Sequence, residues 1–373
     1  MKTENGFLDE DTGFLSAALR DSRQAKRPVL LCNGLLAKHI PCSPRAALDY
    51  FRRLGTLAAE TCQGEKVLVV GFAETATAVG AAVAAEIPGA VYCHTSREPL
   101  SCARLVVDFL EEHSHAVNQA LYLRQAFRDL RRYDRIVFVE DEITTGKTIL
   151  NFLRALRERE EIGSEQGVTV AALVFNACDE TVFSAFNACC CHLTRLDGFL
   201  PVPAGRLGPT VSFSSKLEEP MSALAISGAP DPRLGVWAEE YRVKCAVLAH
   251  EAAARIGEGN VTGKRVLVLG TEECMYPALA FGAEIEGVAA HVRSHSTTRT
   301  PILPQNGEGY PIRARYAFPS LYDEERTTYL YNVDVYDTVV IVTDAPSSSG
   351  GLLRLLRSRG NENVYFISMV SSE

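Results

Sequence analysis

Residues 135–148, with the sequence RIVFVEDEITTGKT, constrain the fold of this chain more than any other segment. Four apolar residues at 136–139 predict a buried strand, and two acids, Glu140 and Asp141, follow it directly. A turn rich in hydroxyl groups and glycine then leads into an apolar stretch that predicts a helix. Carboxylates can accept hydrogen bonds from vicinal sugar hydroxyls, and backbone N–H groups at a helix start can hold a phosphate. The segment therefore predicts a holder for a sugar phosphate.

Two simpler interpretations of this segment exist. The end of the turn, Gly146-Lys147-Thr148, matches a P-loop, but Asp141 occupies the position of the first P-loop glycine. We exclude a Walker-type ATPase, because a carboxylate there would repel nucleotide phosphates. An ordinary strand, acidic turn and helix remains an alternative, since open α/β sheets place such turns at their carboxyl edge.

The composition narrows the class of protein. A chain of 373 residues with 47% hydrophobic residues can form two globular domains, and its net charge of −8 without a basic run argues against nucleic-acid binding. No apolar run approaches the ~20 residues of a membrane span, and the polar N-terminus does not look like a signal peptide. Eleven cysteines without a C-x-x-C pair fit a reduced compartment, and adjacent thiols at 189–191 are poorly placed to share one metal ion. We expect a cytoplasmic protein that contacts neither nucleic acid nor membrane.

Strand and helix patterns alternate along the chain, which predicts an α/β fold with a doubly wound parallel sheet. We expect a polar lead-in at 1–27, a first domain at 28–215 and a second domain at 216–373, joined by a Gly-, Pro- and Ser-rich connection between about 205 and 235. The predicted strands lie at 28–32, 66–70, 90–94, 135–139 and 168–175, and the predicted helices at 43–62, 75–86, 116–133 and 237–256.

The second half repeats motifs of the first. VLVVG at 67–71 recurs as VLVLG at 266–270, and SREPL at 96–100 recurs as TRTPI at 298–302. Tyr-Asp followed by a strand and an aspartate also occurs in both halves, and the three matches keep their order and spacing. Thr343 replaces Glu140 in the second copy, so half of the acidic pair is lost. We expect a second, degenerate α/β domain of similar layout, packed on the first as a pseudo-dimer.

The segment at 136–148 resembles the phosphoribosyl diphosphate (PRPP) motif of the type I phosphoribosyltransferases. This resemblance implies that Glu140 and Asp141 hold the ribose hydroxyls, and that Mg²⁺ lies near Asp141, mainly through the substrate. Lys147 departs from the family, in which many members have a small residue at this position. The turn that would hold the 5′-phosphate consists of Thr144, Thr145, Gly146, Lys147 and Thr148.

Two further loops follow predicted strands. In the resembled family the loop after the 66–70 strand contacts diphosphate, which implies that role for Phe72, Ala73, Glu74 and Thr75. Alternatively, Glu74 is an acid in the first turn of a helix, where it is favourable in its own right. Arg97 offers a bidentate fork for phosphate oxygens, although a surface arginine is the simpler explanation.

Three histidines and a lysine complete the first-half candidates. His113 and His115 lie in a polar segment that resembles the family's mobile catalytic lid, where either could donate a proton to the departing diphosphate. A solvated helix start is the alternative. Lys38 and His39 precede the first long helix and are candidates for the pocket of the acceptor substrate.

Together these motifs resemble one bacterial branch, the phosphoribosyltransferase-like proteins associated with tellurite-resistance operons. That branch is often fused to a C-terminal domain named after a T-R-S-P motif, which stands here as TRTP at 298–301. The resemblance adds four second-domain candidates: Glu272, Glu273, Arg299 and Asp344.

The resemblance implies Mg²⁺-dependent transfer of a phosphoribosyl group from PRPP to an unidentified acceptor, with release of diphosphate, in the synthesis of a nucleoside-like metabolite. We expect small-molecule substrates and either a homodimer or a pseudo-dimer of the two halves. Two alternatives remain open. One is a regulator that binds PRPP or a nucleotide without catalysis, and the other is a phosphorylase or nucleosidase that acts on a ribosyl bond.

Overall fold

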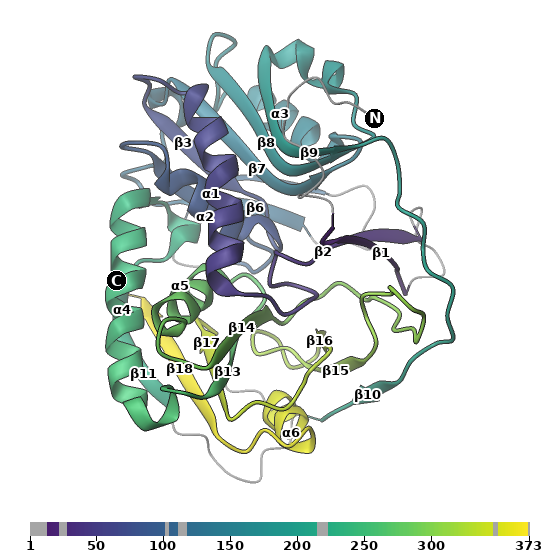
Figure 1. The fold of residues 1–373 in the computed structure, drawn as a ribbon. Coiled ribbons are helices and arrows are strands. Elements are labelled where there is room, and N and C mark those ends of the chain that lie inside the picture. Colours follow the sequence, from purple (N-terminus) through teal and green to yellow (C-terminus); the bar gives the residue numbers. More distant parts are fainter. Residues whose placement is uncertain are drawn as a thin grey trace.

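The computed structural model describes residues 13–21, 28–100, 104–110, 118–214, 223–345 and 350–371. Two mainly parallel sheets carry helices on their faces (Figure 1); the first consists of first-half strands and β12 of the second half, and the second consists of second-half strands. The first sheet has the strand order β12-β4-β3-β7-β8-β9, and the second has the order β11-β18-β17-β13-β14. The expected α/β fold class with parallel sheets is confirmed.

The first half begins with a short antiparallel pair and continues as alternating strands and helices. Its elements are β1 (Leu15–Leu19), β2 (Val29–Asn33), α1 (Pro44–Glu60), β3 (Val67–Gly71), α2 (Ala76–Ala85), β4 (Val91–His94), β5 (Arg104–Leu110), β6 (Asn118–Leu123), η1 (Leu130–Arg132), β7 (Arg135–Ile143), α3 (Lys147–Glu158), β8 (Gly167–Asn176), η2 (Glu180–Phe186) and β9 (Ala188–Leu196).

The second half begins with a short strand. Its elements are β10 (Thr210–Ser212), β11 (Ala223–Ala229), η3 (Pro232–Leu234), β12 (Val236–Trp237), α4 (Ala238–Ile256), η4 (Glu258–Asn260), β13 (Arg265–Gly270), α5 (Tyr276–Ile285), β14 (His291–Ser296), β15 (Arg315–Pro319), β16 (Thr327–Tyr331), β17 (Thr338–Thr343), α6 (Gly350–Ser358) and β18 (Val364–Ser371).

The two halves share one order of elements. The series from α1 to β8 recurs from α4 to β18, including an antiparallel pair between the second and third parallel strands, β5/β6 in one half and β15/β16 in the other. The same local bond also recurs, because Asp134 Oδ2 accepts from the Lys66 N–H at 2.8 Å and Asp337 Oδ2 accepts from the Arg265 N–H at 2.8 Å. These correspondences support an internal duplication.

Local sequence explains the elements nearest the first-half sheet edge. Ser43 caps α1 by accepting a hydrogen bond from the Ala46 N–H, and Pro44 occupies the first turn, as the sequence predicted. Helix α2 consists mainly of small residues, so it packs very close to the sheet. A Cβ added at Gly80 would lie only 2.9 Å from the Gly71 Cα, so this approach requires glycine.

Helices hold the two halves together. Helix α1 contacts α5, and α2 contacts α4, which is the reciprocal pattern of a two-fold interface. One continuous hydrophobic cluster contains Phe51 of α1, Val83 of α2, Tyr241 of α4 and Tyr276 of α5. Burying each such side chain contributes roughly 1.5–3 kcal/mol. The halves therefore share a core and form a pseudo-dimer within one chain.

Several segments differ from the sequence expectations. Residues 116–133 were predicted as a helix, but the described part contains β6 and η1, because 118–123 pairs antiparallel with β5 and buries alternate residues, Gln119, Leu121 and Leu123. The expected 205–235 connection contains β10, β11 and η3, and the expected lead-in contains β1. Strands β10 and β11 pair with strands that are distant in sequence, and β1 is too short to give a clear periodic signal. No helix in the described ranges is both long and apolar enough to cross a membrane.

Replacing Tyr276 with alanine should lower the free energy of unfolding by about 3–5 kcal/mol, because a buried ring in the shared core is lost. We expect one cooperative urea transition by circular dichroism and by fluorescence of Trp237, the single tryptophan. Val247→Ala, at an α4 side chain that is 55% exposed, is the control and should change stability by less than about 0.5 kcal/mol. Two separated transitions would contradict a shared core.

Candidate functional site

The predicted phosphate and ribose groups meet at one edge of the first sheet. Strands β3 and β7 are parallel neighbours with Gly71 opposite Val139, so the residues that follow these two positions emerge side by side. The chain leaves β3 towards β4 on one side and leaves β7 towards β8 on the other. Such a switch point at the carboxyl ends of parallel strands is where open α/β sheets bind ligands.

The acidic pair lies on a strand rather than in a turn. Strand β7 continues to Ile143, with Glu140 opposite Ala172 and Glu142 opposite Val174 on β8. Because side chains alternate along a strand, Glu140 and Asp141 leave it on opposite faces. A ligand that contacts both must therefore lie across the end of the strand.

Glu142 is a third acid that the sequence reasoning missed, although the E-D-E alternation was visible. Its Oε1 accepts a hydrogen bond from Asn176 Nδ2 at 2.6 Å. Burial, followed by the charge of Glu142, raises the pKa of Asp141 to about 7. Asp141 therefore changes its charge near neutral pH, and a nearby cation would favour its ionised form.

The turn after β7 has the shape expected of a phosphate cradle. Gly146 has φ 66° and stands at the start of α3, and a Cβ there would lie 2.6 Å from the Phe183 ring, so only glycine fits. Thr145 and Lys147 are exposed, and Thr144 and Thr148 are half-buried. The first N–H groups of α3 have no partner within the helix, which favours an anion at this point.

The predicted diphosphate loop is more constrained than expected. The Phe72 ring packs in the core against Phe138 and Phe152. The backbone N–H of Phe72 donates to the Val139 carbonyl oxygen at 3.0 Å. The Ala73 N–H donates to Thr95 Oγ1 at 2.8 Å, and the Ala73–Glu74 peptide bond is cis. The N–H groups of Phe72 and Ala73 are therefore already hydrogen-bonded within the protein, and contact of these two residues with diphosphate stays a prediction.

Glu74 is bound by cations from both halves. Lys38 Nζ lies 2.5 Å from Glu74 Oε1, and Arg299 Nε lies 3.6 Å from Glu74 Oε2. Burial alone would raise the pKa of Glu74, but the charges of Lys38 and Arg299 outweigh it and lower that pKa to about 2. Lys38 is completely buried and also donates to the Glu272 carbonyl oxygen at 2.7 Å, while burial lowers its pKa.

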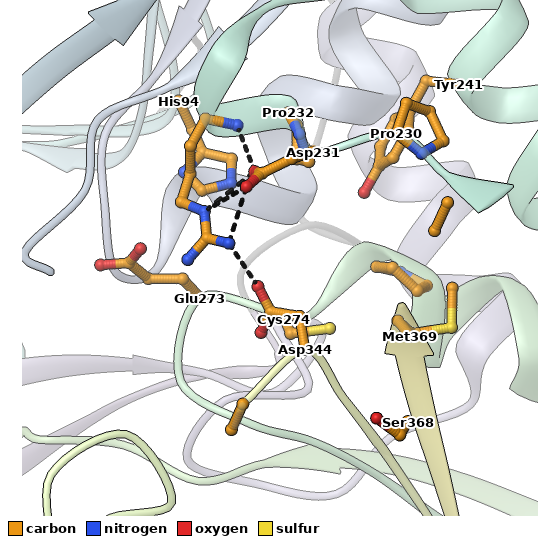
Figure 2. Close-up of a pocket in the computed structure, with 14 residues that line it drawn as sticks. His94, Pro230, Asp231, Pro232, Tyr241, Glu273, Cys274, Asp344, Ser368 and Met369 are labelled. Carbon is orange, nitrogen blue, oxygen red and sulfur yellow. Dashed lines mark hydrogen bonds and ion pairs between the residues drawn. The ribbon is translucent and has the colours of Figure 1, made fainter. Parts of the chain in front are cut away.

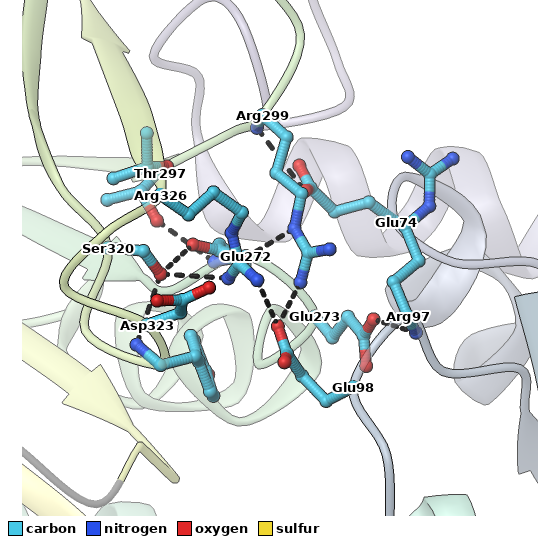
Figure 3. A network of polar contacts seen from close by, with 12 residues as sticks. Glu74, Arg97, Glu98, Glu272, Glu273, Thr297, Arg299, Ser320, Asp323 and Arg326 are labelled. Carbon is cyan, nitrogen blue, oxygen red and sulfur yellow. Dashed lines mark hydrogen bonds and ion pairs between the residues drawn. The ribbon is translucent and has the colours of Figure 1, made fainter. Parts of the chain in front are cut away.

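Charged residues of the second half extend this set of ion pairs (Figure 3). Glu272 Oε2 lies 2.7 Å from Arg299 Nε and 2.8 Å from Arg326 Nη2. Both arginines also form ion pairs with Glu98, and Arg326 Nη1 lies 2.7 Å from Glu98 Oε1. We call this set the ion cluster; it contains three cations and three carboxylates, namely Lys38, Arg299, Arg326, Glu74, Glu98 and Glu272.

Two hydrogen bonds across the halves are reciprocal. Glu74 accepts from the Arg299 N–H at 3.3 Å, and Glu273, the matching residue of the second copy, accepts from the Arg97 N–H at 2.8 Å. Glu273 also accepts from Ser96 Oγ at 2.9 Å, and burial raises its pKa. Each half thus fixes the loop of the other, so the predicted diphosphate loop depends on the second half.

The remaining first-half candidates have different positions. Lys38 and His39 are buried at the junction of the halves. Neither ring nitrogen of His39 has a hydrogen-bond partner in the described ranges, and burial lowers its pKa to about 3, so the ring is neutral. His113 and His115 lie outside the described residues.

The acids suit Mg²⁺ held partly by substrate. Among the residues that the structure describes, no three His, Cys, Asp or Glu side chains gather as a metal-binding group. Mg²⁺ usually keeps several waters and binds through one or two carboxylates together with substrate phosphates. Asp141 at the strand end, close to the phosphate turn, fits that mode.

Two family models match the chain. The one described as "Phosphoribosyl transferase" (PRTase_2) matches residues 14–194, and the one described as "TRSP domain C terminus to PRTase_2" matches residues 231–358. A search of curated proteins gave no match.

Solved structures with a similar fold are distant. Adenine phosphoribosyl transferase from Trypanosoma brucei, in complex with AMP, pyrophosphate and ribose-5-phosphate, has 13% identity and a TM-score of 0.36, over 49% of this chain and 76% of that one. Adenine phosphoribosyltransferase from Rhodothermus marinus has 14% identity and a TM-score of 0.34, over 50% and 96%. A hypoxanthine-guanine phosphoribosyltransferase from Bacillus anthracis has 14% identity and a TM-score of 0.24, over 36% and 69%.

The family matches, rather than these distant similarities, identify the chain and confirm the resemblance drawn from its motifs. Residues 14–194 belong to this phosphoribosyl transferase family, and residues 231–358 form the TRSP domain on the C-terminal side of the transferase domain.

Proposed function

We propose that the first half transfers a phosphoribosyl group from PRPP to an acceptor and releases diphosphate, with Mg²⁺ bound together with the substrate. The observation that carries this proposal is the end of β7, where Glu140 and Asp141 stand directly before the Gly146 turn and the start of α3. This arrangement lies within the segment that matches the phosphoribosyl transferase model.

The phosphate turn anchors the substrate away from the reacting carbon. Thr144 to Thr148 and the first N–H groups of α3 would bind the 5′-phosphate. Binding energy from this remote group positions C1 of the ribose for reaction.

The acids act on the ribose. In the transition state the bond between C1 and the diphosphate oxygen lengthens and the ribose becomes cationic. Glu140 and Asp141 would bind the ribose hydroxyls and place negative charge near that cation. Asp141 would also hold Mg²⁺, mainly through the substrate, and this ion supplies positive charge for the leaving oxygens. With its pKa near 7, Asp141 ionises fully once that cation is present.

Arg97 and Thr75 remain the candidates for diphosphate contact. Thr75 is half-buried at the start of α2, and Arg97 is half-buried directly after the β4 edge. Because the cations of the ion cluster already neutralise Glu74, that carboxylate does not present uncompensated charge to the leaving group. An anionic diphosphate is therefore compatible with this loop.

The acceptor and product are a further part of the proposal. By the motif resemblance, the product is a nucleoside-like metabolite formed in a tellurite-resistance context. Diphosphate release on mixing the protein with PRPP, Mg²⁺ and candidate acceptors tests the function, with mass spectrometry to find the product. Binding of PRPP without turnover by any acceptor would indicate a regulator instead, and phosphate-dependent cleavage of a nucleoside would indicate a phosphorylase.

Asp141→Asn should reduce turnover by about 10²-fold or more, because a charged contact to the transition state is lost. Steady-state diphosphate release measures this effect. Asp197→Asn, an exposed acid in the same half, is the matched control and should retain full activity. Equal rates for the two variants would refute the role of Asp141.

The same variant should become more stable than wild type as the pH rises. Asp141 has a pKa of about 7 when folded, against ~3.9 when unfolded. Between these values the folded state holds more protons, so the wild type loses stability from about pH 4 to pH 7, and asparagine does not titrate. The Tm of Asp141→Asn relative to wild type should therefore be unchanged at pH 4 and highest above pH 7. A difference that shrinks with rising pH would show that the Asp141 environment is wrong.

Arg299→Met should lower the free energy of unfolding by about 3–5 kcal/mol, because it removes the cation that Glu74, Glu98 and Glu272 share and leaves their charge only partly balanced. Turnover of the remaining folded protein should also fall, since the Arg299 side chain helps to hold the Glu74 loop. Arg313→Met, an exposed arginine of the same half, is the control for chemical denaturation and activity. If both variants unfold at the same urea concentration, the ion cluster does not brace the loop.

A further inference from the structure

A cavity of about 300 Å³ opens at the carboxyl edge of the second sheet (Figure 2). Its walls come from the loop after β13, the loop after β17, the end of β18 and the segment around η3, with His94 contributed by the first half. The chain leaves β13 towards β14 and β17 towards β18, so the cavity stands at the switch point of this sheet. It is the second-half counterpart of the proposed PRPP site.

The charges of the cavity differ from those of the first-half site. Asp231, Glu273 and Asp344 line it, against one arginine, Arg233. Arg233 Nη2 lies 2.8 Å from Asp231 Oδ2 and 3.1 Å from Asp344 Oδ2, so its charge is already shared by two carboxylates. Asp231 and Asp344 together carry one negative charge more than Arg233 balances, and Glu273 adds acceptor oxygens, so the cavity disfavours phosphate groups and favours a cation with N–H donors.

A buried histidine adds a polar group to the same wall. His94 is 4% exposed, and its Nδ1 lies 2.9 Å from the Thr95 carbonyl oxygen. Figure 2 shows His94, Glu273, Asp231 and Asp344 towards one end of the cavity, and Tyr241 and Met369 towards the other. The cavity therefore has a polar, acidic end and an apolar, aromatic end.

Hydrogen bonds connect the walls of this cavity to the proposed diphosphate loop. Thr95, next to His94, accepts a hydrogen bond from the Ala73 N–H at 2.8 Å. The Glu273 backbone oxygen accepts from Thr77 Oγ1 at 2.9 Å, and its carboxylate accepts from the Arg97 N–H. A ligand that moves His94 or Glu273 thus acts on residues that position the first-half loops.

We propose that this cavity is a second binding site, distinct from the PRPP site, for a small organic cation with an aromatic or apolar body. The charged head would lie among Asp231, Glu273 and Asp344, and the body against Tyr241 and Met369, where a cation near the tyrosine ring gains further attraction. The inference goes beyond the transferase activity and does not depend on it.

Three indoles that differ mainly in charge test the proposal. Tryptamine carries a positive charge, tryptophol is neutral and indole-3-acetate is negative. Calorimetry or ligand-observed NMR with the full chain should show tryptamine binding at least roughly tenfold more tightly than tryptophol, and indole-3-acetate binding most weakly. Tighter binding of the anion, equal binding of all three, or no binding of any would overturn the proposal.

Substitutions of residues that line the cavity test whether tryptamine binds there. Ser368→Phe should abolish tryptamine binding by filling the cavity, and Asp344→Asn should weaken it roughly tenfold by removing one carboxylate. Glu362→Gln removes an exposed acid before the opposite end of β18 and should leave binding unchanged. Unchanged affinity in both cavity variants would overturn the assignment, and Asp344→Asn keeps the test valid if Ser368→Phe fails to fold.

Asp141→Asn separates this proposal from the transferase proposal. The variant should bind tryptamine like the wild type, because Asp141 does not line the cavity. Loss of tryptamine binding in Asp141→Asn would place the cation in the first-half site and contradict a second site. Failure of transferase activity in any assay would leave these binding results unaffected.

Discussion

The buried ion pair of Lys38 with Glu74, completed by Arg299, is the interaction on which the rest of the structure depends. A buried carboxylate is tolerated only when it is paired, and here one cation comes from each half. The first-half loop at the switch point therefore has its observed form only with the second half in place. Fold, interface and proposed site are consequences of one set of contacts rather than separate features.

The internal pseudo-symmetry explains why the contacts take this form. Equivalent elements pack reciprocally, and equivalent glutamates, Glu74 and Glu273, accept hydrogen bonds from equivalent arginine N–H groups. The two switch points have nevertheless diverged. The first keeps two neighbouring acids, Glu140 and Asp141, close to a glycine turn, whereas the second has one, Asp344, which is bound by Arg233 and Tyr322. One half is thus suited to a sugar phosphate, and the other has an acidic cavity of different chemistry.

Local patterns predicted much of the fold. The capped start of α1, the buried strand β3 and the glycine turn before α3 follow from neighbouring residues, so the sequence was sufficient for them. The continuation of β7 through Glu142 was missed because acids carry no strand signal, and pairing with β8 decides it. Lys38 and Glu74 were assigned to separate subsites because nothing local reveals that a distant half, through Arg299, brings them together.

Calorimetric titration of the full chain with PRPP in the presence of Mg²⁺ tests the central claim most directly. One PRPP should bind per chain, because the first half keeps the acidic pair Glu140-Asp141, which has become Thr343-Asp344 in the second half, and because three carboxylates line the second-half cavity. No binding, or two equivalent sites per chain, would contradict this account.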